Sequence, residues 1–249
     1  MIEVIFAVMI QAEEVPLPVD EPAMPTKAEE AQKLGYTTLR GGGYHFERKD
    51  GTEGVAVPGR ILLNRGVIEL FACGAGGKEH ESVVRIECDV HSLDGALTLC
   101  GFRRGKVPKS FGEEDQGDRL IVLVQWRSEG NEVITHRAED FILHARREMP
   151  MPRVGWTFVG AWVDVLDPLS PPNERKTYPG LAAVASKSVM TTFRDSSTLL
   201  DNPIPDAVDD TLYAANDAVV PPPGTPVLLI LRAPTKYEQD QIAKLEKEW

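Results

Sequence analysis

Short apolar runs separated by turn residues limit the possible folds of this chain more than any other feature. Residues 120–126 form one such run, residues 132–136 form the next, and Ser128-Glu129-Gly130-Asn131 lies between them. Two alternating runs joined by a polar, glycine-containing turn are typical of an antiparallel β-hairpin. A second hairpin is predicted within residues 55–73, with its turn at Asn64-Arg65-Gly66. Further strands are predicted at 82–88, 156–165, 181–186, 189–193 and 227–231.

Helical periodicity is limited to a few short segments. Ser92 is a suitable N-cap for a helix that runs to Cys100, and Gly101 suits the left-handed position just beyond its end. Other helices are predicted at 138–147, at 209–215 and, as a charged surface helix, at 237–249. Predicted strands outnumber predicted helices and are arranged as hairpins, so the predicted fold class is α+β, with a predominantly antiparallel β-sheet and a few short helices.

The composition divides the chain into three parts. Residues 1–40 are an N-terminal extension, residues 41–234 are predicted to form a single α+β domain, and residues 235–249 form the charged C-terminal helix. Met1–Ile10 is apolar but lacks a basic flank, so it is either the remnant of a signal peptide or a first strand. Residues 11–35 combine four prolines with many acids, which predicts an extended, poorly packed linker.

Charge and cysteine content exclude several classes of protein. The chain has 249 residues and a net charge of −11, from 38 acids against 27 bases, which argues against a nucleic-acid partner. No apolar run approaches the ~20 residues that a membrane-spanning helix needs. Three cysteines do not make a disulfide framework, so we expect reduced thiols, with Cys88 and Cys100 facing the interior.

A glycine-rich loop, Cys73–Ser82, carries the densest group of reactive side chains. After three glycines, five polar residues follow one another: Lys78, Glu79, His80, Glu81 and Ser82. The loop is not a P-loop, because Glu79 stands where that motif requires Ser or Thr. A looser anion site formed by the backbone amides of 74–77 stays open beside a purely structural role.

The motifs around this loop resemble those of the YdjY-like family of bacterial proteins. The resemblance covers roughly residues 45–233 and is carried by GVIELFACGAGGKEHES (66–82), GALTLCGFRRGKVP (95–108), GWTFVGAWV (155–163) and YAANDAVVPPPGTPVLLILR (213–232). It implies a bacterial protein that faces the cell envelope, in the periplasm or another extracytoplasmic space, although a true start at Met1 would favour the cytoplasm. The resemblance implies no catalytic residue, and the chain departs from the family at Asp94, near which members often carry a histidine.

Two functions from different classes follow from these residues. The first is a module that binds a small molecule or a protein partner through Lys78–Ser82, in a cleft bordered by Asn216 or Thr225. The second is a hydrolase-type or metal-assisted enzyme centred on His80, Glu81 and Ser82. We favour the binding module, assign no catalytic residue, and identify no cofactor. Cys73, His80, Cys88 and His91 have suitable chemistry for zinc but lack the paired spacing of structural zinc sites, so no metal ligand is assigned.

Overall fold

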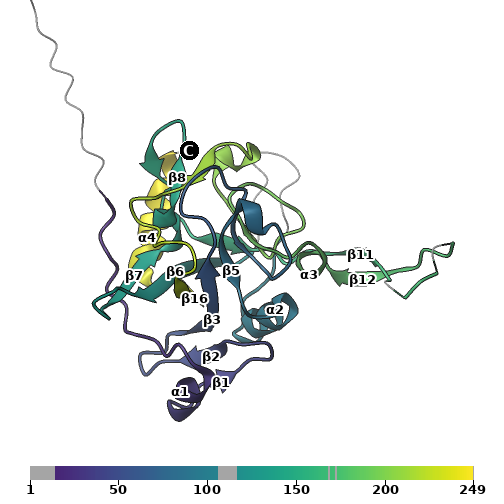
Figure 1. Cartoon of the computed structure of the whole chain (residues 1–249), viewed down its shortest axis with the longest axis horizontal. Coiled ribbons are helices and arrows are strands. Elements are labelled where there is room, and N and C mark those ends of the chain that lie inside the picture. The colour runs from purple at the N-terminus through teal and green to yellow at the C-terminus, as the bar shows by residue number, and fades with distance from the viewer. Residues whose placement is uncertain (1–14, 106–116, 168, 172, 249) are drawn as a thin grey trace, which may run out of the picture.

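The computed structural model describes residues 15–105, 117–167, 169–171 and 173–248 (Figure 1). Met1–Ile10, predicted as a signal remnant or a first strand, lies outside the described residues. Most strand pairs are antiparallel and the helices are short, which confirms the α+β class. Within the described ranges, no helix has the length and apolar character needed to cross a membrane.

The helices are few and are distributed along the chain. The α-helices are α1 (Ala28–Lys33), α2 (Val90–Leu99), α3 (Ala182–Ser186) and α4 (Lys236–Leu245). The 3-10 helices are η1 (Glu79–Glu81), η2 (Ala138–Phe141), η3 (Pro205–Val208) and η4 (Glu246–Glu248).

Strands make up most of the molecule. The first eight are β1 (Thr37–Thr38), β2 (Tyr44–Glu47), β3 (Glu53–Ile61), β4 (Leu70–Cys73), β5 (Ser82–Ile86), β6 (Arg119–Arg127), β7 (Val133–Arg137) and β8 (Ile142–His144). The others are β9 (Met149–Pro150), β10 (Trp156–Phe158), β11 (Trp162–Leu166), β12 (Thr177–Leu181), β13 (Ser188–Thr191), β14 (Leu200–Asp201), β15 (Tyr213–Ala215) and β16 (Pro226–Arg232).

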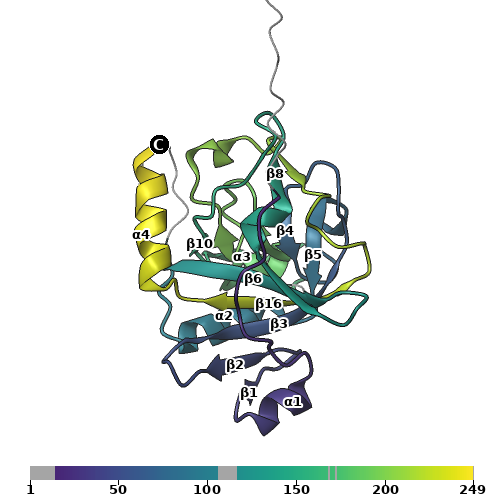
Figure 2. The ribbon, with the colours of Figure 1, turned by 90° about the vertical axis from the view of Figure 1, so that its left-hand side faces the viewer.

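The main sheet closes on itself. Its hydrogen-bonded neighbours run β3-β16-β6-β10-β14-β13-β4-β5, and β5 pairs back with β3. All of these pairs are antiparallel except β13–β14 and β4–β5. β2 and β1 extend the sheet beyond β3, and β7 pairs with β6, so these strands lie outside the ring (Figure 2). The ring leaves its own strands without free edges, which removes sites of edge-to-edge pairing.

Both faces of the central strands are buried, in two separate clusters. On β16, Leu229 and Leu231 face the cluster inside the ring, whereas Leu228 and Ile230 face a second cluster outside it. β6 follows the same rule, with Val122 inside and its neighbours outside. The alternation follows from the strand geometry, in which successive side chains point to opposite faces. A strand that is buried on both faces must be apolar throughout, as residues 227–231 are.

The second cluster is covered by residues 15–36, which we call the strap. Met24 is buried and Ala31 is fully buried against the outer face. The Val19 amide donates to the Thr135 carbonyl at 2.7 Å, and Glu21 pairs with Arg48 and Arg232. In Figure 2 the strap runs across β6, β16 and β3. The prediction of a poorly packed linker over residues 11–35 is therefore wrong at Val19, Glu21, Met24 and Ala31, which have partners on the body, whereas most other described residues of the strap are exposed.

The C-terminal helix α4 confirms the predicted charged helix. Its start is fixed by a capping box, in which the Thr235 hydroxyl accepts from the Glu238 amide and Glu238 accepts from the Thr235 amide at 2.7 Å. Ile242 is buried in the same outer cluster as the strap, and Glu238 binds Arg232 at 2.8 Å. The helix is thus docked on the sheet rather than free in solvent.

Several predicted elements have a different structure. β3 pairs with β2, β5 and β16, so residues 55–73 do not form a hairpin. Residues 138–147 form η2 and then β8 instead of a helix, because the buried acids Glu139 and Asp140 pair with arginines. The helix predicted at 209–215 ends as β15, and the strand predicted at 181–186 is α3. The cap of α2 is Asp89, which accepts from the Ser92 amide at 3.0 Å.

The strand predicted at 156–165 is divided in two. Trp156 is fully buried in β10, but Gly160 has a φ of 46° and redirects the chain away from the body. β11 then pairs with β12 in a separate two-stranded sheet, from Trp162 opposite Leu181 to Leu166 opposite Thr177. This ribbon, which we call the arm (residues 162–181), projects from the side of the molecule in Figure 1.

Candidate functional site

The glycine-rich loop connects β4 to β5 and forms a network of ion pairs. Lys78 pairs with Glu69, which directly precedes β4, and its Nζ lies 3.3 Å from Glu81 Oε2. The hydrogen bond to Glu69 raises the pKa of Lys78 above its usual value, so the amine stays charged. Glu79 accepts from the Gly76 amide at 3.0 Å and lies 3.5 Å from Arg85. The charges in the loop are therefore largely neutralised by one another.

His80 and Ser82 do not form a catalytic pair. The His80 ring lies 3.0 Å from Glu81 Oε1, and its side chain is 76% exposed. Ser82 is buried, and its hydroxyl donates to the Lys78 carbonyl at 2.7 Å. A nucleophile needs its hydroxyl within hydrogen-bond reach of a base, and the Ser82 hydroxyl is instead used to close the turn.

The glycines of this loop allow close packing. The Gly74 amide donates to the Lys187 carbonyl at 2.8 Å, and a Cβ at Gly77 would lie 2.7 Å from the Lys187 Cβ. Gly76 has a φ of 76°. The segment is glycine-rich because it packs on the turn between α3 and β13, and this geometry favours the structural role over an anion site.

Asn216 and Thr225 lie apart from this network. The Asn216 amide donates to the Asp140 carbonyl at 2.8 Å and is buried. The Thr225 hydroxyl donates to the Pro222 carbonyl at 2.7 Å, within its own turn. In the described part of the chain, neither residue has a hydrogen bond to Lys78–Ser82. The structure brings the five loop residues together but does not add these two to a shared cleft.

The cysteines and histidines that we considered as zinc ligands are not grouped together. Cys73 and Cys88 are buried and all three thiols are free, as expected, whereas Cys100 is only half-buried. Over the described ranges, the one group of ligand-type side chains close enough to share an ion is His45, Glu53 and Cys100. Burial and the charge of Glu53 raise the pKa of the Cys100 thiol to about 12. Sequence spacing gives no signal for this group, because strand pairing and a helix end assemble it.

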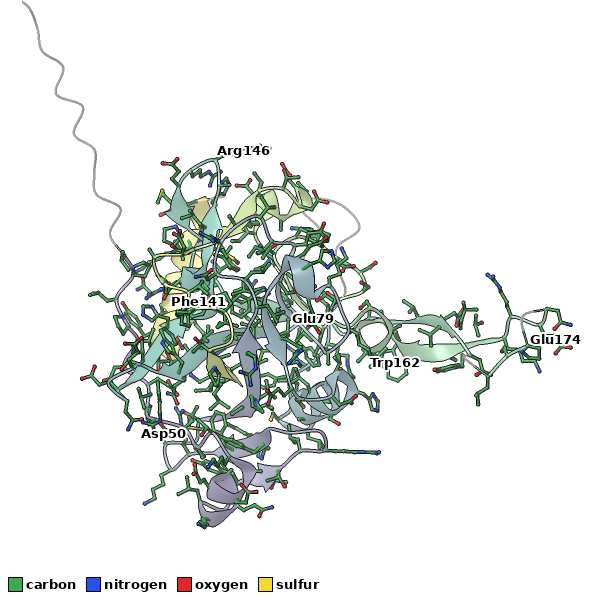
Figure 3. All side chains as sticks on the ribbon, in the orientation of Figure 1. Asp50, Glu79, Phe141, Arg146, Trp162 and Glu174 are labelled. Carbon is green, nitrogen blue, oxygen red and sulfur yellow. The ribbon has the colours of Figure 1, made fainter. Side chains whose placement is uncertain are left out.

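The arm is the other feature that sequence reasoning missed. Trp162, expected on a buried strand, is 56% exposed, and Leu169 beyond the end of β11 is 90% exposed. Figure 3 places Trp162 at the base of the arm and Glu174 at its far end. The signal available in the sequence was the proline-rich stretch 166–179, because a connection of that length inside a compact domain is uncommon and is usually functional.

A hollow of about 370 Å³ lies at the base of the arm. It is lined by both strands of the arm together with α3 and the exposed His91 of α2. Its walls are mainly apolar: Trp162, Val165, Leu166, Tyr178, Pro179, Leu181, Val184 and Ala185. An apolar hollow beside exposed apolar side chains is typical of a binding surface.

Comparison with known proteins identifies no relative. No protein-family model, no curated protein and no solved structure matches this chain.

Proposed function

We propose that this protein is a self-associating binding module in which the arm joins two copies of the chain. The observation that carries the proposal is the exposure of apolar side chains on both faces of the arm. These are Trp162, Val163, Leu166, Leu169 and Tyr178. Apolar surface of this kind on a projecting element is stabilised when a partner covers it.

The arm gains little support from its own chain. Among the described strands, β11 and β12 pair only with each other. An isolated two-stranded ribbon is marginally stable in water, and Leu181 is the one buried residue of these two strands. A partner that covers the arm would therefore order it as well as bury it.

A second copy of the chain fits the arm because the two complementary parts lie on one element. The exposed Leu169 lies beyond the end of β11, and the apolar hollow extends from Leu166 back along the paired strands to α3 at the base of the arm. In a two-fold dimer with antiparallel arms, the far end of each arm meets the base of the other, as a self-complementary interface requires. The charges near the far end, Glu174, Arg175 and Lys176, sum to only +1, so no large local charge opposes its approach to the base of the other arm.

This proposal keeps the class that the sequence favours, a partner-binding module, but transfers the contact from Lys78–Ser82 to the arm. The enzyme centred on His80, Glu81 and Ser82 is less well supported, because the Ser82 hydroxyl and His80 have separate partners. If the chain is a YdjY-like protein, as its motifs suggest, the dimer is expected in the bacterial envelope.

Sedimentation velocity of the full chain over a range of concentrations tests the proposal. We expect a reversible monomer–dimer equilibrium in the wild type and a monomer in the Trp162→Ser/Leu169→Ser double variant. The matched control is Leu99→Ser/Tyr237→Ser, which removes two other exposed apolar side chains away from the arm and should dimerise as the wild type does. A wild type that stays monomeric, or an arm variant that dimerises normally, would contradict the proposal.

A further inference from the structure

Three metal-ligating side chains converge from three elements on one side of the main sheet. His45 lies in β2, Glu53 begins β3, and Cys100 follows the last residue of α2. One ligand atom of each side chain lies within 4.8 Å of the other two, and His45 Nε2 is 2.7 Å from Glu53 Oε1. Imidazole, carboxylate and thiol are the three ligand types that zinc uses in proteins.

The strand register explains how the side chains meet. β2 and β3 pair antiparallel, with Glu47 opposite Glu53. Tyr44 and Phe46 of β2 are buried in the outer cluster, so His45 and Glu47 point to the other face. α2 ends over this face and contributes Cys100, which packs at the margin of the inner cluster. Glu53 is thus on the same face as His45 because it is directly opposite Glu47.

The group has an excess of negative charge. Glu47 and Glu53 are directly opposite on neighbouring strands, an arrangement of like charges that destabilises a sheet. Asp50 lies in the turn between them, while the guanidinium of Arg48 is directed to Glu21 of the strap. A bound cation would offset this repulsion between the acids. The single hydrogen bond between His45 and Glu53 does not offset it.

We propose that His45, Glu53 and Cys100 bind a zinc ion. The mixed nitrogen, oxygen and sulfur set favours zinc over calcium and magnesium, which prefer oxygen ligands alone. The site is independent of the dimer, because none of its residues belongs to the arm.

The geometry requires only small movements to admit the ion. Zinc–ligand bonds of about 2.0–2.3 Å at tetrahedral angles place neighbouring ligand atoms about 3.3–3.6 Å apart. His45 Nε2 and Glu53 Oε1 would separate slightly from their 2.7 Å contact. The Cys100 thiol, which lies within 4.8 Å of both ligand atoms, would move toward them. A hollow of about 360 Å³, lined by Glu53, Cys100 and Asp50, adjoins the group and gives the ion access and room for a fourth ligand.

Cobalt titration of the metal-free full chain tests the site, because Co²⁺ replaces zinc in such sites and a bound thiolate gives a near-ultraviolet charge-transfer band. We expect about one Co²⁺ per chain with this band, displaced by zinc. His45→Ala, Glu53→Gln and Cys100→Ser should each weaken zinc binding about tenfold or more. The controls His91→Ala and Cys88→Ser, which change a histidine and a cysteine elsewhere, should bind within about twofold of the wild type.

A second measurement uses the wild type alone, so its result does not depend on whether the variants fold. Zinc should slow alkylation of Cys100 by iodoacetamide, as read by mass spectrometry of its peptide, and a chelator should reverse the protection. Absence of a thiolate band, binding that survives all three ligand substitutions, or binding lost in Cys88→Ser would each overturn the proposal.

Discussion

The central sheet and the arm are both antiparallel, yet they differ in what covers them. β16 lies between β3 and β6 with one face in the inner cluster and the other beneath the strap and α4. β11 and β12 have comparable strand pairing but exposed side chains on both faces. Hydrogen bonding alone therefore does not separate the two regions. The difference is burial, which supplies most of the free energy that favours a folded sheet.

The two regions also differ in whether other parts of the same chain cover their apolar faces. The outer face of the central sheet is covered by residues of the same chain that are far away in sequence, such as Met24 and Ile242. The arm has no such segment in the described part of the chain. The central sheet is thus covered within one chain, whereas the arm leaves the apolar surface that we propose a second copy covers.

Removing the strap should have the largest effect on stability, since it makes the outer face of the central sheet as bare as the arm. A chain that starts at residue 37 should lose about 4 kcal/mol or more in its free energy of unfolding, measured with urea. The loss combines exposure of the outer cluster with the loss of Glu21 from the two arginines that it joins. An unchanged urea midpoint would show that the strap is a dispensable linker after all.

Single substitutions in the two regions sharpen the comparison. Ile230→Ala on the outer face of β16 should cost about 2–5 kcal/mol, because Ile230 is fully buried. Leu166→Ala in the arm is the matched control and should change the free energy of unfolding of the monomer by less than about 0.5 kcal/mol. Equal effects at the two positions would contradict the difference in burial.

Acid pH should weaken the contact of α4 with the sheet. Burial raises the pKa of Glu238, but hydrogen bonds from Arg232 and the Thr235 amide outweigh burial and hold it below its usual value. A lowered pKa contributes stability above the ordinary carboxyl pKa, and this stability is lost as the pH falls through the folded-state value. Glu238→Gln should be about 1–3 kcal/mol less stable than the wild type at pH 7, by urea unfolding.

The difference between Glu238→Gln and the wild type should become smaller between about pH 5 and pH 3. Asp240→Asn is the control, because Asp240 forms an exposed pair with Lys236 and should behave as the wild type at each pH. A gap that stays constant as the pH falls would exclude the ionised carboxylate as its cause.

The smallest expected effect concerns the salt dependence of the arm. Each chain has a net charge of −11, so two copies repel one another at low ionic strength. Salt screens this repulsion without weakening apolar burial, so dimerisation should strengthen by a few-fold between about 0.05 and 0.5 M sodium chloride. Sedimentation velocity at both concentrations measures it, and weaker association at high salt would indicate an interface held by ion pairs instead.

Local patterns predicted the elements whose partners are close in sequence. The hairpin of β6 and β7 was predicted because its turn and both strands lie within one window, and Asn131 does adopt a positive φ there. The start of α4 was not predicted to the residue, although its Thr235 and Glu238 form a capping box that is legible in the sequence. Gly101 also has the expected left-handed conformation after α2.

Long-range partners explain most of the errors. The composition of the strap is typical of a linker. Its packing could not be predicted, because nothing near Glu21 in the sequence indicates that Glu21 pairs with Arg232. Residues 162–165 of the arm were predicted as the end of a buried strand, because the alternation continues across Gly160 although the chain turns there. The density of polar residues identified the loop Lys78–Ser82 in the sequence. The sequence could not predict which of its side chains are exposed and which are buried.

The place of β16 in the sheet has a consequence for how the protein is made. β3 and β6 are translated well before residues 226–232, and they become neighbours only when β16 enters between them. Until then a nascent chain presents two apolar strands with unpaired edges, the species that aggregates most readily. Residues 226–232 therefore decide whether the first half of the chain reaches its native state, and emergence of β16, rather than of the early strands, sets the moment at which the central sheet can form.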